Sequence, residues 1–254
     1  MSQISTSVLI GVMKRHHDRT GFTIVELLIV IVIVGILAAI TIVAYNGIQE
    51  RARLASAMAF ERQIHSKYGA SATGDWTFDE CSGDKAKNNG APQTTDDILG
   101  TATWITSTAT GRGCALSFNG ATRIETLAGL GGNMYVKAAW IRVAPSQGCV
   151  NIISRGVTNG ADAPFWLTGC KLTAGYQGNY SVVQAPQIMN DGKWHYVAVI
   201  WEDGNLTLYS DGQRVASTPT TTAPAPIGGV VSIGSHTTGN FFVGDIDNPF
   251  VAAS

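Results

Sequence analysis

Residues 21–44 read GFTIVELLIVIVIVGILAAITIVA, and Glu26 is the only charged residue in the 23-residue run from Phe22 to Ala44. An α-helix of this length crosses about 30 Å of hydrocarbon at a rise of roughly 1.5 Å per residue. Ile and Val disfavour a helix in water, but in lipid the backbone must satisfy its own hydrogen bonds, so the helix forms there. The run therefore predicts a membrane-spanning helix.

The segment just before this run is basic. Residues 13–21, MKRHHDRTG, carry three basic residues and one acid, namely Lys14, Arg15, Arg19 and Asp18. Positively charged flanks stay on the cytoplasmic side of a membrane, so the chain after Ala44 is predicted to lie outside the cytoplasm. Its cysteines would then face an oxidising environment.

A carboxylate inside a membrane helix costs about 2–3 kcal/mol or more, so Glu26 is a candidate functional residue. It belongs to GFTIVELL (21–28), which resembles the processing motif of type IV prepilins and of the pseudopilins of type II secretion. The resemblance implies that a prepilin peptidase cuts between Gly21 and Phe22 and methylates the new N-terminus. It also implies that the amine of Phe22 pairs with Glu26 of an adjacent subunit during self-assembly into a helical filament.

This resemblance divides the N-terminal part into a leader peptide (1–21) and a pilin helix (22–68), of which 22–44 span the membrane. Translation from Met13 instead of Met1 would give a shorter leader of nine residues, and both starts remain open. A plain membrane anchor and a secretory signal peptide are the alternatives. Neither alternative accounts for Glu26.

Beyond the apolar run, the helical pattern becomes amphipathic between Asn46 and Tyr68. Small and apolar residues recur there at helical spacing, namely Ile48, Ala52, Ala55, Met58 and Ala59. We expect this face to rest on the chain's own following domain rather than to make subunit contacts alone. GASATG (69–74) is predicted to end the helix and to act as a linker.

From residue 75 to 254 the pattern is typical of strands. Short apolar runs alternate with Gly, Asn and Asp turns, namely CALSF, KAAWIRV, NIISR, PFWLTG, WHYVAVIW, LTLYS and VVSIG. Asp203-Gly204 and Asp211-Gly212 predict tight hairpin turns. The predicted fold class is α+β: a long N-terminal helix followed by a mainly antiparallel β-sandwich, a jelly-roll of more than ten strands.

Several blocks of this region resemble, in family order, the laminin G-like (concanavalin A-like lectin/glucanase) domains. They are WTFDE (76–80), LSFNG (116–120), DGKWHYVAV (191–199), LYSDGQRV (208–215), IGS (233–235) and FVGDID (242–247). The resemblance implies this sandwich fold over about 75–252, with a glycan or a protein as its ligand. Relatives often add a further strand or turn where this chain stops soon after Asp247.

The four cysteines contain no CxxC pair, and no His stands at zinc-ligand spacing from them, which argues against a zinc site. If Ser154 pairs with Phe165 in an antiparallel hairpin that turns at 158–163, Cys149 lies opposite Cys170. Two disulfides, Cys149–Cys170 and Cys81–Cys114, are therefore predicted. Each would stabilise the domain by about 2–4 kcal/mol.

Glucanases on this sandwich use an E-x-D-x-E strand, and the nearest match here, GDIDN (244–248), lacks both Glu. No catalytic residue and no enzyme activity are therefore predicted, and His195 is interpreted as a framework residue. No cofactor is required, but relatives bind Ca²⁺ through loop oxygens. The candidates here are Asp79, Asp84, Asn88, Asp245 and Asp247, with solvated turn acids as the alternative interpretation.

Among the six tryptophans, Trp140 and Trp194 are predicted to be core residues. The positions of three others, Trp104, Trp166 and Trp201, are left open, and none is assigned to sugar stacking. The formal net charge is −1 and no basic run follows the N-terminal segment, so nucleic-acid binding is not expected.

Together these features predict a structural subunit of a type IV pilus or related filament that displays a lectin-like sandwich for adhesion to surface glycans or proteins. The precursor would cross the inner membrane once with a cytoplasmic leader, and the mature subunit would lie at the cell surface. A pseudopilin of a type II secretion-like machine is the first alternative. A membrane-tethered protein that binds or hydrolyses glycans is the second.

Overall fold

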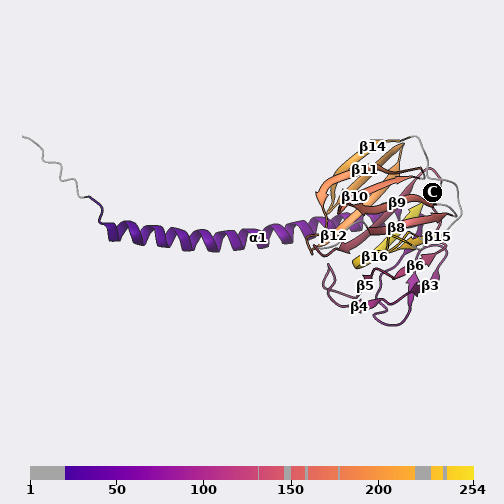
Figure 1. Ribbon diagram of the computed structural model, residues 1–254, viewed down its shortest axis with the longest axis horizontal. Coiled ribbons are helices and arrows are strands. Elements are labelled where there is room, and N and C mark those ends of the chain that lie inside the picture. Colours follow the sequence, from indigo (N-terminus) through magenta and orange to yellow (C-terminus); the bar gives the residue numbers. More distant parts are fainter. Residues whose placement is uncertain are drawn as a thin grey trace, which may run out of the picture. The chain divides into compact units, whose positions relative to one another are not determined.

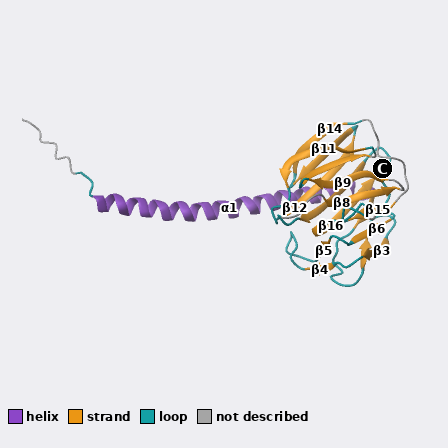
Figure 2. Ribbon diagram, in the orientation of Figure 1, coloured by secondary structure: helices purple, strands orange, loops and turns teal. Residues whose placement is uncertain are grey.

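The computed structural model describes residues 21–130, 132–145, 150–157, 160–176, 178–220, 230–236 and 239–254. In this part of the chain, one long helix, α1 (Ile24–Tyr68), and a short 3-10 helix, η1 (Gly69–Ser71), precede a series of strands (Figure 2). The predicted α+β class, with the helix first and a sandwich after it, is confirmed. The chain divides into two compact units, one up to Gln49 and one from Glu50 onward.

The first unit contains the apolar half of α1. Its large apolar side chains from Phe22 to Ile48 are 49–90% exposed. By length and composition α1 could cross a bilayer, with a mean hydropathy of 3.3 over its most apolar part. Apolar surface of this extent requires lipid or neighbouring subunits to cover it.

Besides the second part of α1 and η1, the described part of the second unit contains two antiparallel sheets of eight strands (Figure 1). The first sheet has the order β14-β13-β12-β7-β16-β5-β4, with β1 paired to β16. Its strands are β1 (Ala72–Asp75), β4 (Thr103–Ile105), β5 (Ala115–Asn119), β7 (Tyr135–Arg142), β12 (Trp194–Glu202), β13 (Asn205–Ser210), β14 (Gln213–Pro219) and β16 (Val243–Ala253).

The second sheet has the order β11-β10-β9-β8-β15-β6-β3-β2. Its strands are β2 (Lys85–Asn88), β3 (Thr94–Leu99), β6 (Arg123–Thr126), β8 (Val150–Val157), β9 (Gly160–Thr168), β10 (Lys171–Tyr176), β11 (Asn179–Ile188) and β15 (Val230–Ile233). All seven apolar runs quoted from the sequence form strands, and β16 continues past Asp247 to Ala253 in the middle of the first sheet.

The first sheet buries side chains on both of its faces. Ile141 of β7 and Val197 of β12 point into the core between the sheets. Their neighbours Trp140 and Tyr196 point the other way and pack with Ile64 of α1. Side chains alternate between the faces of a strand, so a strand covered on both faces needs an almost continuous apolar sequence. This double coverage explains the unbroken run WHYVAVIW.

The helix does rest on its own sandwich, as predicted, but through a face that shares only part of the predicted one, Met58 among it. The buried side chains of α1 are Ala57, Ile64 and Tyr68, with Leu54, Met58 and Phe60 half-buried beside them. Ala52 and Ala55, which the pattern placed on the docked face, are exposed. Alanines occur all round this helix and do not distinguish its faces, whereas the large side chains provide most of the buried area.

The predicted linker over 69–74 is in fact ordered structure. After η1, β1 pairs with the C-terminal strand β16, with Ala72 opposite Ala252 and Asp75 opposite Phe250. The Thr73 hydroxyl donates a hydrogen bond of 2.8 Å to the carbonyl of Gly129. These small and polar residues form a strand because their backbone groups pair with the backbone of β16.

Both predicted hairpin turns are confirmed, with positive φ at each central residue. Asp203 and Gly204 have φ of 51° and 70°, and Asp211 and Gly212 have φ of 51° and 82°. A Cβ added to Gly212 would lie 2.8 Å from the hydroxyl oxygen of Ser56 on α1. Glycine at this turn therefore also lets the hairpin approach the helix.

The disulfide Cys81–Cys114 is present, with its Cα atoms 5.4 Å apart. Cys149 lies outside the described residues, so the second bridge, Cys149–Cys170, stays a prediction. The register used to predict it was wrong: Phe165 pairs with Ile153, not with Ser154, and two irregularities interrupt the pairing of β8 with β9. Bulges of this kind cannot be read from strand spacing alone.

An acid is buried on the helix-facing side of the first sheet. Asp247 is 3% exposed, and its Oδ1 atom has no hydrogen-bond partner in the part of the chain that the structure describes. Burial, together with the nearby carboxylates of Glu61 and Asp79, raises the pKa of Asp247 to about 8. Its side chain is therefore an uncharged acid at neutral pH.

The docked face of α1 can be tested by a pair of neighbouring substitutions. Ile64 is 2% exposed, so Ile64→Ala is expected to lower the free energy of unfolding by about 2–5 kcal/mol. Gln63 is exposed, and Gln63→Ala should change the free energy of unfolding by less than about 0.5 kcal/mol. Urea unfolding of the full chain in detergent, followed by tryptophan fluorescence, measures both; equal effects would contradict the assigned face.

The buried acid predicts a pH dependence of stability. The folded-state pKa of Asp247, about 8, exceeds an unfolded value of about 3.9, so the folded state keeps a proton that the unfolded state loses. Stability contributed by this group is therefore lost as the pH rises from about 4 to 8. Asp247→Asn should raise Tm at pH 8 relative to the unmodified chain, and the gain should shrink toward pH 4.

Asp97→Asn, which replaces an exposed carboxylate paired with Lys85, serves as the control for this prediction. Parallel Tm profiles for Asp247→Asn and the unmodified chain between pH 4 and 8 would show that the buried acid does not titrate as described.

Candidate functional site

Glu26, predicted to pair with a neighbouring subunit, is bound by its own helix end in the single chain. Its Oε2 atom accepts hydrogen bonds of 2.8 Å from both the backbone N–H and the hydroxyl of Thr23. The N–H of Glu26 in turn donates to the hydroxyl oxygen of Thr23 at 3.2 Å. This reciprocal arrangement is a capping box at the first turn of α1.

Gly21 and Phe22, the predicted cleavage pair, lie just before this cap, and the Phe22 side chain is 90% exposed. A cut after Gly21 would create an amine one residue from Thr23. The three residues of the predicted processing and assembly site are thus close in the sequence and at one end of the helix. The contact from Phe22 to Glu26 of another subunit remains a prediction.

In the part of α1 that packs on the sandwich, a network of charges joins the helix to the sheet. Arg53 donates a hydrogen bond of 2.7 Å to Oδ2 of Asp211, which also lies 2.7 Å from Nδ1 of His195. Nε2 of His195 lies 3.1 Å from Asp191. Burial acts to lower the pKa of His195, but the hydrogen bond and charge of Asp211 outweigh it and raise that pKa. These contacts give His195 a framework role.

The five calcium candidates do not form one cluster. Asn88 is buried, where its side-chain oxygen accepts hydrogen bonds from the backbone N–H groups of Asp75 and Gly90. Asp245 forms an ion pair of 2.7 Å with Arg142. Asp79 and Asp84 are exposed and Asp247 is buried. No group of three or more His, Cys, Asp or Glu that could hold a metal ion occurs in the described ranges. Calcium binding stays an untested prediction.

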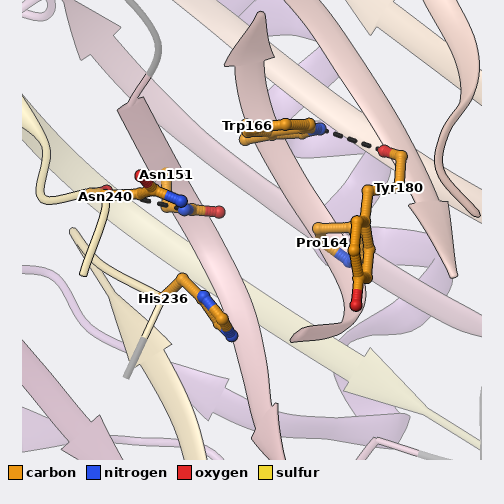
Figure 3. A pocket seen from close by; sticks show the side chains of 6 residues that line it. All are labelled: Asn151, Pro164, Trp166, Tyr180, His236 and Asn240. Carbon is orange, nitrogen blue, oxygen red and sulfur yellow. Dashed lines mark hydrogen bonds between the residues drawn. The ribbon is translucent and has the colours of Figure 1, made fainter. Parts of the chain in front are cut away.

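A pocket lies on the second sheet, at residues that the sequence did not single out as a site. It encloses about 170 Å³ and is lined by Asn151, Pro164, Trp166, Tyr180, His236 and Asn240. Figure 3 shows Trp166, Tyr180 and Pro164 on one side and Asn151, Asn240 and His236 on the other.

Strand alternation places this pocket on the outer face of the second sheet. Pro164 and Trp166 of β9 alternate with the core residues Phe165 and Leu167, so they face away from the core. The first sheet, by contrast, has its outer face against α1. The pocket is therefore on the sheet that the helix does not cover.

Hydrogen bonds fix the pocket walls. The indole N–H of Trp166 donates to the carbonyl of Tyr180 at 3.1 Å (Figure 3). The carboxamide oxygen of Asn151 accepts from the hydroxyl of Ser154 at 2.5 Å, and the backbone N–H of Asn151 donates to the carbonyl of Asn240 at 3.1 Å. These side chains are held in place before any ligand arrives.

Below the pocket, the buried Lys137 joins the two sheets. Its Nζ donates hydrogen bonds to the backbone carbonyls of Ile153 on β8 and Ala163 on β9. Ala163 directly precedes Pro164 and has a positive φ of 46°. The core lysine thus fixes the backbone that carries one wall of the pocket.

Only one of the pocket residues could have been suspected from the sequence. Trp166 was among the tryptophans left open, while Trp140, Trp194 and Trp201 are all buried. The asparagines, Pro164, Tyr180 and His236 carry no local signal, because they meet only through the pairing of strands and turns distant in sequence.

Two family models match the sequence. The concanavalin A-like lectin/glucanases superfamily matches residues 117–251, and the prokaryotic N-terminal methylation motif matches residues 16–42. Both resemblances drawn from the sequence motifs are thereby confirmed.

Solved structures share the fold at low identity. Domain 4 of the extracellular arabinanase AbnA from Geobacillus stearothermophilus, in complex with arabinotriose, is 16% identical with a TM-score of 0.58, covering 72% of this chain and 92% of that one. The binding domain of botulinum neurotoxin DC in complex with SialylT is 9% identical with a TM-score of 0.54, covering 72% of this chain and 47% of that one.

A botulinum neurotoxin type C structure, whose description concerns interaction with two ganglioside molecules, is 9% identical with a TM-score of 0.57 and covers 74% of this chain and 49% of that one. At such identities these likenesses support the fold alone. With the family model covering more than half of its length, the chain belongs to the concanavalin A-like lectin/glucanases superfamily, and it joins that sandwich to a prepilin-type N-terminus.

Proposed function

We propose that this protein is a structural subunit of a type IV pilus or a related filament, and that its sandwich binds glycans during adhesion. The N-terminal motif and the apolar part of α1 support membrane anchoring and processing by a prepilin peptidase. In this proposal the precursor is anchored in the inner membrane before processing, and the processed subunit is displayed at the cell surface.

One observation carries the proposal. A single helix, α1, provides both a membrane-length apolar segment that carries the processing motif and a segment that packs on the sandwich. If such a helix assembles into a filament, the sandwich packed on it is carried into the filament as well. Because the pocket lies on the sheet that α1 does not cover, docking of the helix leaves it accessible.

The sandwich is proposed to bind rather than to hydrolyse glycans. Solved relatives include domains in complex with arabinotriose and with SialylT, which supports a carbohydrate ligand for this fold. In the strand that offers the nearest match to a glucanase motif, Asp245 is paired with Arg142 and Asp247 is buried. Glycoside hydrolysis requires two carboxyl groups flanking an accessible sugar, which this pair does not provide.

The filament role is tested by Glu26→Ala, with the exposed Asp97→Ala as a control carboxylate. Without the carboxylate, an incoming subunit has no partner for the amine of its neighbour, so we expect filament yield to fall at least tenfold while the amount in the membrane stays unchanged. Sheared-fibre yield, quantified by immunoblot, measures the effect. Asp97→Ala should leave the yield unchanged.

Normal fibre yield from Glu26→Ala would contradict this assembly mechanism. Immunogold labelling of intact cells with an antibody to the sandwich then separates the two kinds of filament. Label along surface fibres supports a pilus, whereas label confined to the cell envelope would favour a pseudopilus and overturn the adhesive role.

A further inference from the structure

We infer that the pocket on β8, β9 and β11 holds one uncharged sugar ring and discriminates against acidic sugars such as sialic acid. This inference rests on the proposed glycan-binding function and specifies the ligand class of that same site. Five features of the pocket support it: its size, its aromatic wall, an unpartnered imidazole nitrogen, a carboxamide and a lining without Asp, Glu, Lys or Arg.

The size limits the ligand. A volume of about 170 Å³ is well below the roughly 300–1,000 Å³ of pockets that enclose drug-sized ligands. The pocket therefore accommodates about one ring. Pro164 and Asn151, on opposite sides of the pocket, are buried, while Tyr180 is 40% exposed and Asn240 is exposed. Further sugars of a chain would extend past the rim into solvent.

The aromatic wall suits the apolar face of a sugar. The C–H groups of a pyranose ring carry partial positive charge, and the face of an aromatic ring is negative, so the two attract each other when stacked. Trp166 is half-buried and fixed by its hydrogen bond to the Tyr180 carbonyl, so its ring needs little ordering on binding. A flat, rigid indole beside Pro164 provides such a stacking surface.

The opposite wall contains a buried polar atom that has no hydrogen-bond partner. Nε2 of His236 is buried and has no hydrogen-bond partner within the ranges the structure describes. A buried polar atom without a partner costs about 1–3 kcal/mol, and a turn of the imidazole toward the pocket would let a ligand hydroxyl satisfy it. The backbone of His236 is held by two hydrogen bonds of 2.9 Å with Gly239, so the ring is anchored beside the pocket.

Asn240 adds a carboxamide at the rim. This group combines a donor and an acceptor, and adjacent hydroxyls of one sugar ring present the same combination. Asn240 has a positive φ of 49°, and its backbone carbonyl accepts a hydrogen bond from the Asn151 N–H. These two features fix the position of the Asn240 Cα atom. Asn240 and His236 can therefore bind hydroxyl groups of a ring that stacks on Trp166.

The charge of the lining sets the preference for a neutral ring. None of the six lining residues is Asp, Glu, Lys or Arg, and the Nζ of Lys137 below the pocket is buried and already bonded to two backbone carbonyls. Recognition of a carboxylate ordinarily uses Arg or Lys in charge-assisted hydrogen bonds. A sialic acid carboxylate would lose water in this pocket and gain no cationic partner there, which weakens its binding.

The experiment measures binding of the full chain, purified in detergent, to immobilised glycans that end in galactose or N-acetylglucosamine. The same glycans capped with sialic acid form the second arm. By biolayer interferometry we expect at least tenfold tighter binding to the uncapped glycans. Trp166→Ala and His236→Ala should each weaken that binding at least tenfold, and Asn240→Ala about twofold to tenfold.

Asn205→Ala is the matched control, because Asn205 is exposed on the hairpin between β12 and β13, away from the pocket. It should bind like the unmodified chain. Asn240→Ala changes an exposed side chain and keeps the test valid if the Trp166 variant fails to fold.

Three results would overturn the inference in distinguishable ways. Tighter binding to the sialylated glycans would refute the neutral-sugar assignment while leaving the proposed glycan binding intact. Glycan binding that Asn240→Ala and His236→Ala do not weaken would place the site elsewhere. No binding to either set of glycans would contradict the glycan-binding part of the proposed function itself.

Discussion

The apolar surface of α1 is the constraint from which the rest of the molecule follows. Between Phe22 and Ile48 its large side chains are 49–90% exposed, and water cannot be their final environment. After Glu50 the same helix covers the outer face of the first sheet, where Trp140, Tyr196 and Phe250 would otherwise be exposed. The sandwich therefore depends on the helix for its second core, and the helix depends on lipid or other subunits for its first half.

Glu26 interrupts that apolar surface, and its contacts suggest how a subunit tolerates it. In the single chain the capping box with Thr23 satisfies the carboxylate locally. In the proposed assembly, part of this local bonding is exchanged for the amine of a neighbour, a charge pair that is stronger in a low-dielectric setting. Because the same carboxylate is hydrogen-bonded in the single chain, the proposed assembly would set the stagger of subunits without leaving its acceptor atom unbonded in the membrane precursor.

Sequence patterns predicted the order of the elements well, because the membrane helix, the strands and the hairpins at Asp203 and Asp211 depend on local composition and backbone preference. Features that depend on distant partners were not predictable. The segment 69–74 ends in a strand, β1, only because β16 lies beside it. The helix docks through Ile64 and Tyr68 rather than through Ala52 and Ala55, and bulges shift the register near Phe165. The pocket was likewise not predictable, because its six lining residues come from several segments that are distant in the sequence.

The intact mass of the mature chain tests the central claim most directly, because the proposed filament assembly depends on a new amine at Phe22. Purified from membranes or sheared fibres, the protein is expected to begin at Phe22 and to carry one added methyl group. A chain that keeps residues before Gly21, with no cut and no methylation, would contradict the filament account and leave a tethered lectin-like sandwich.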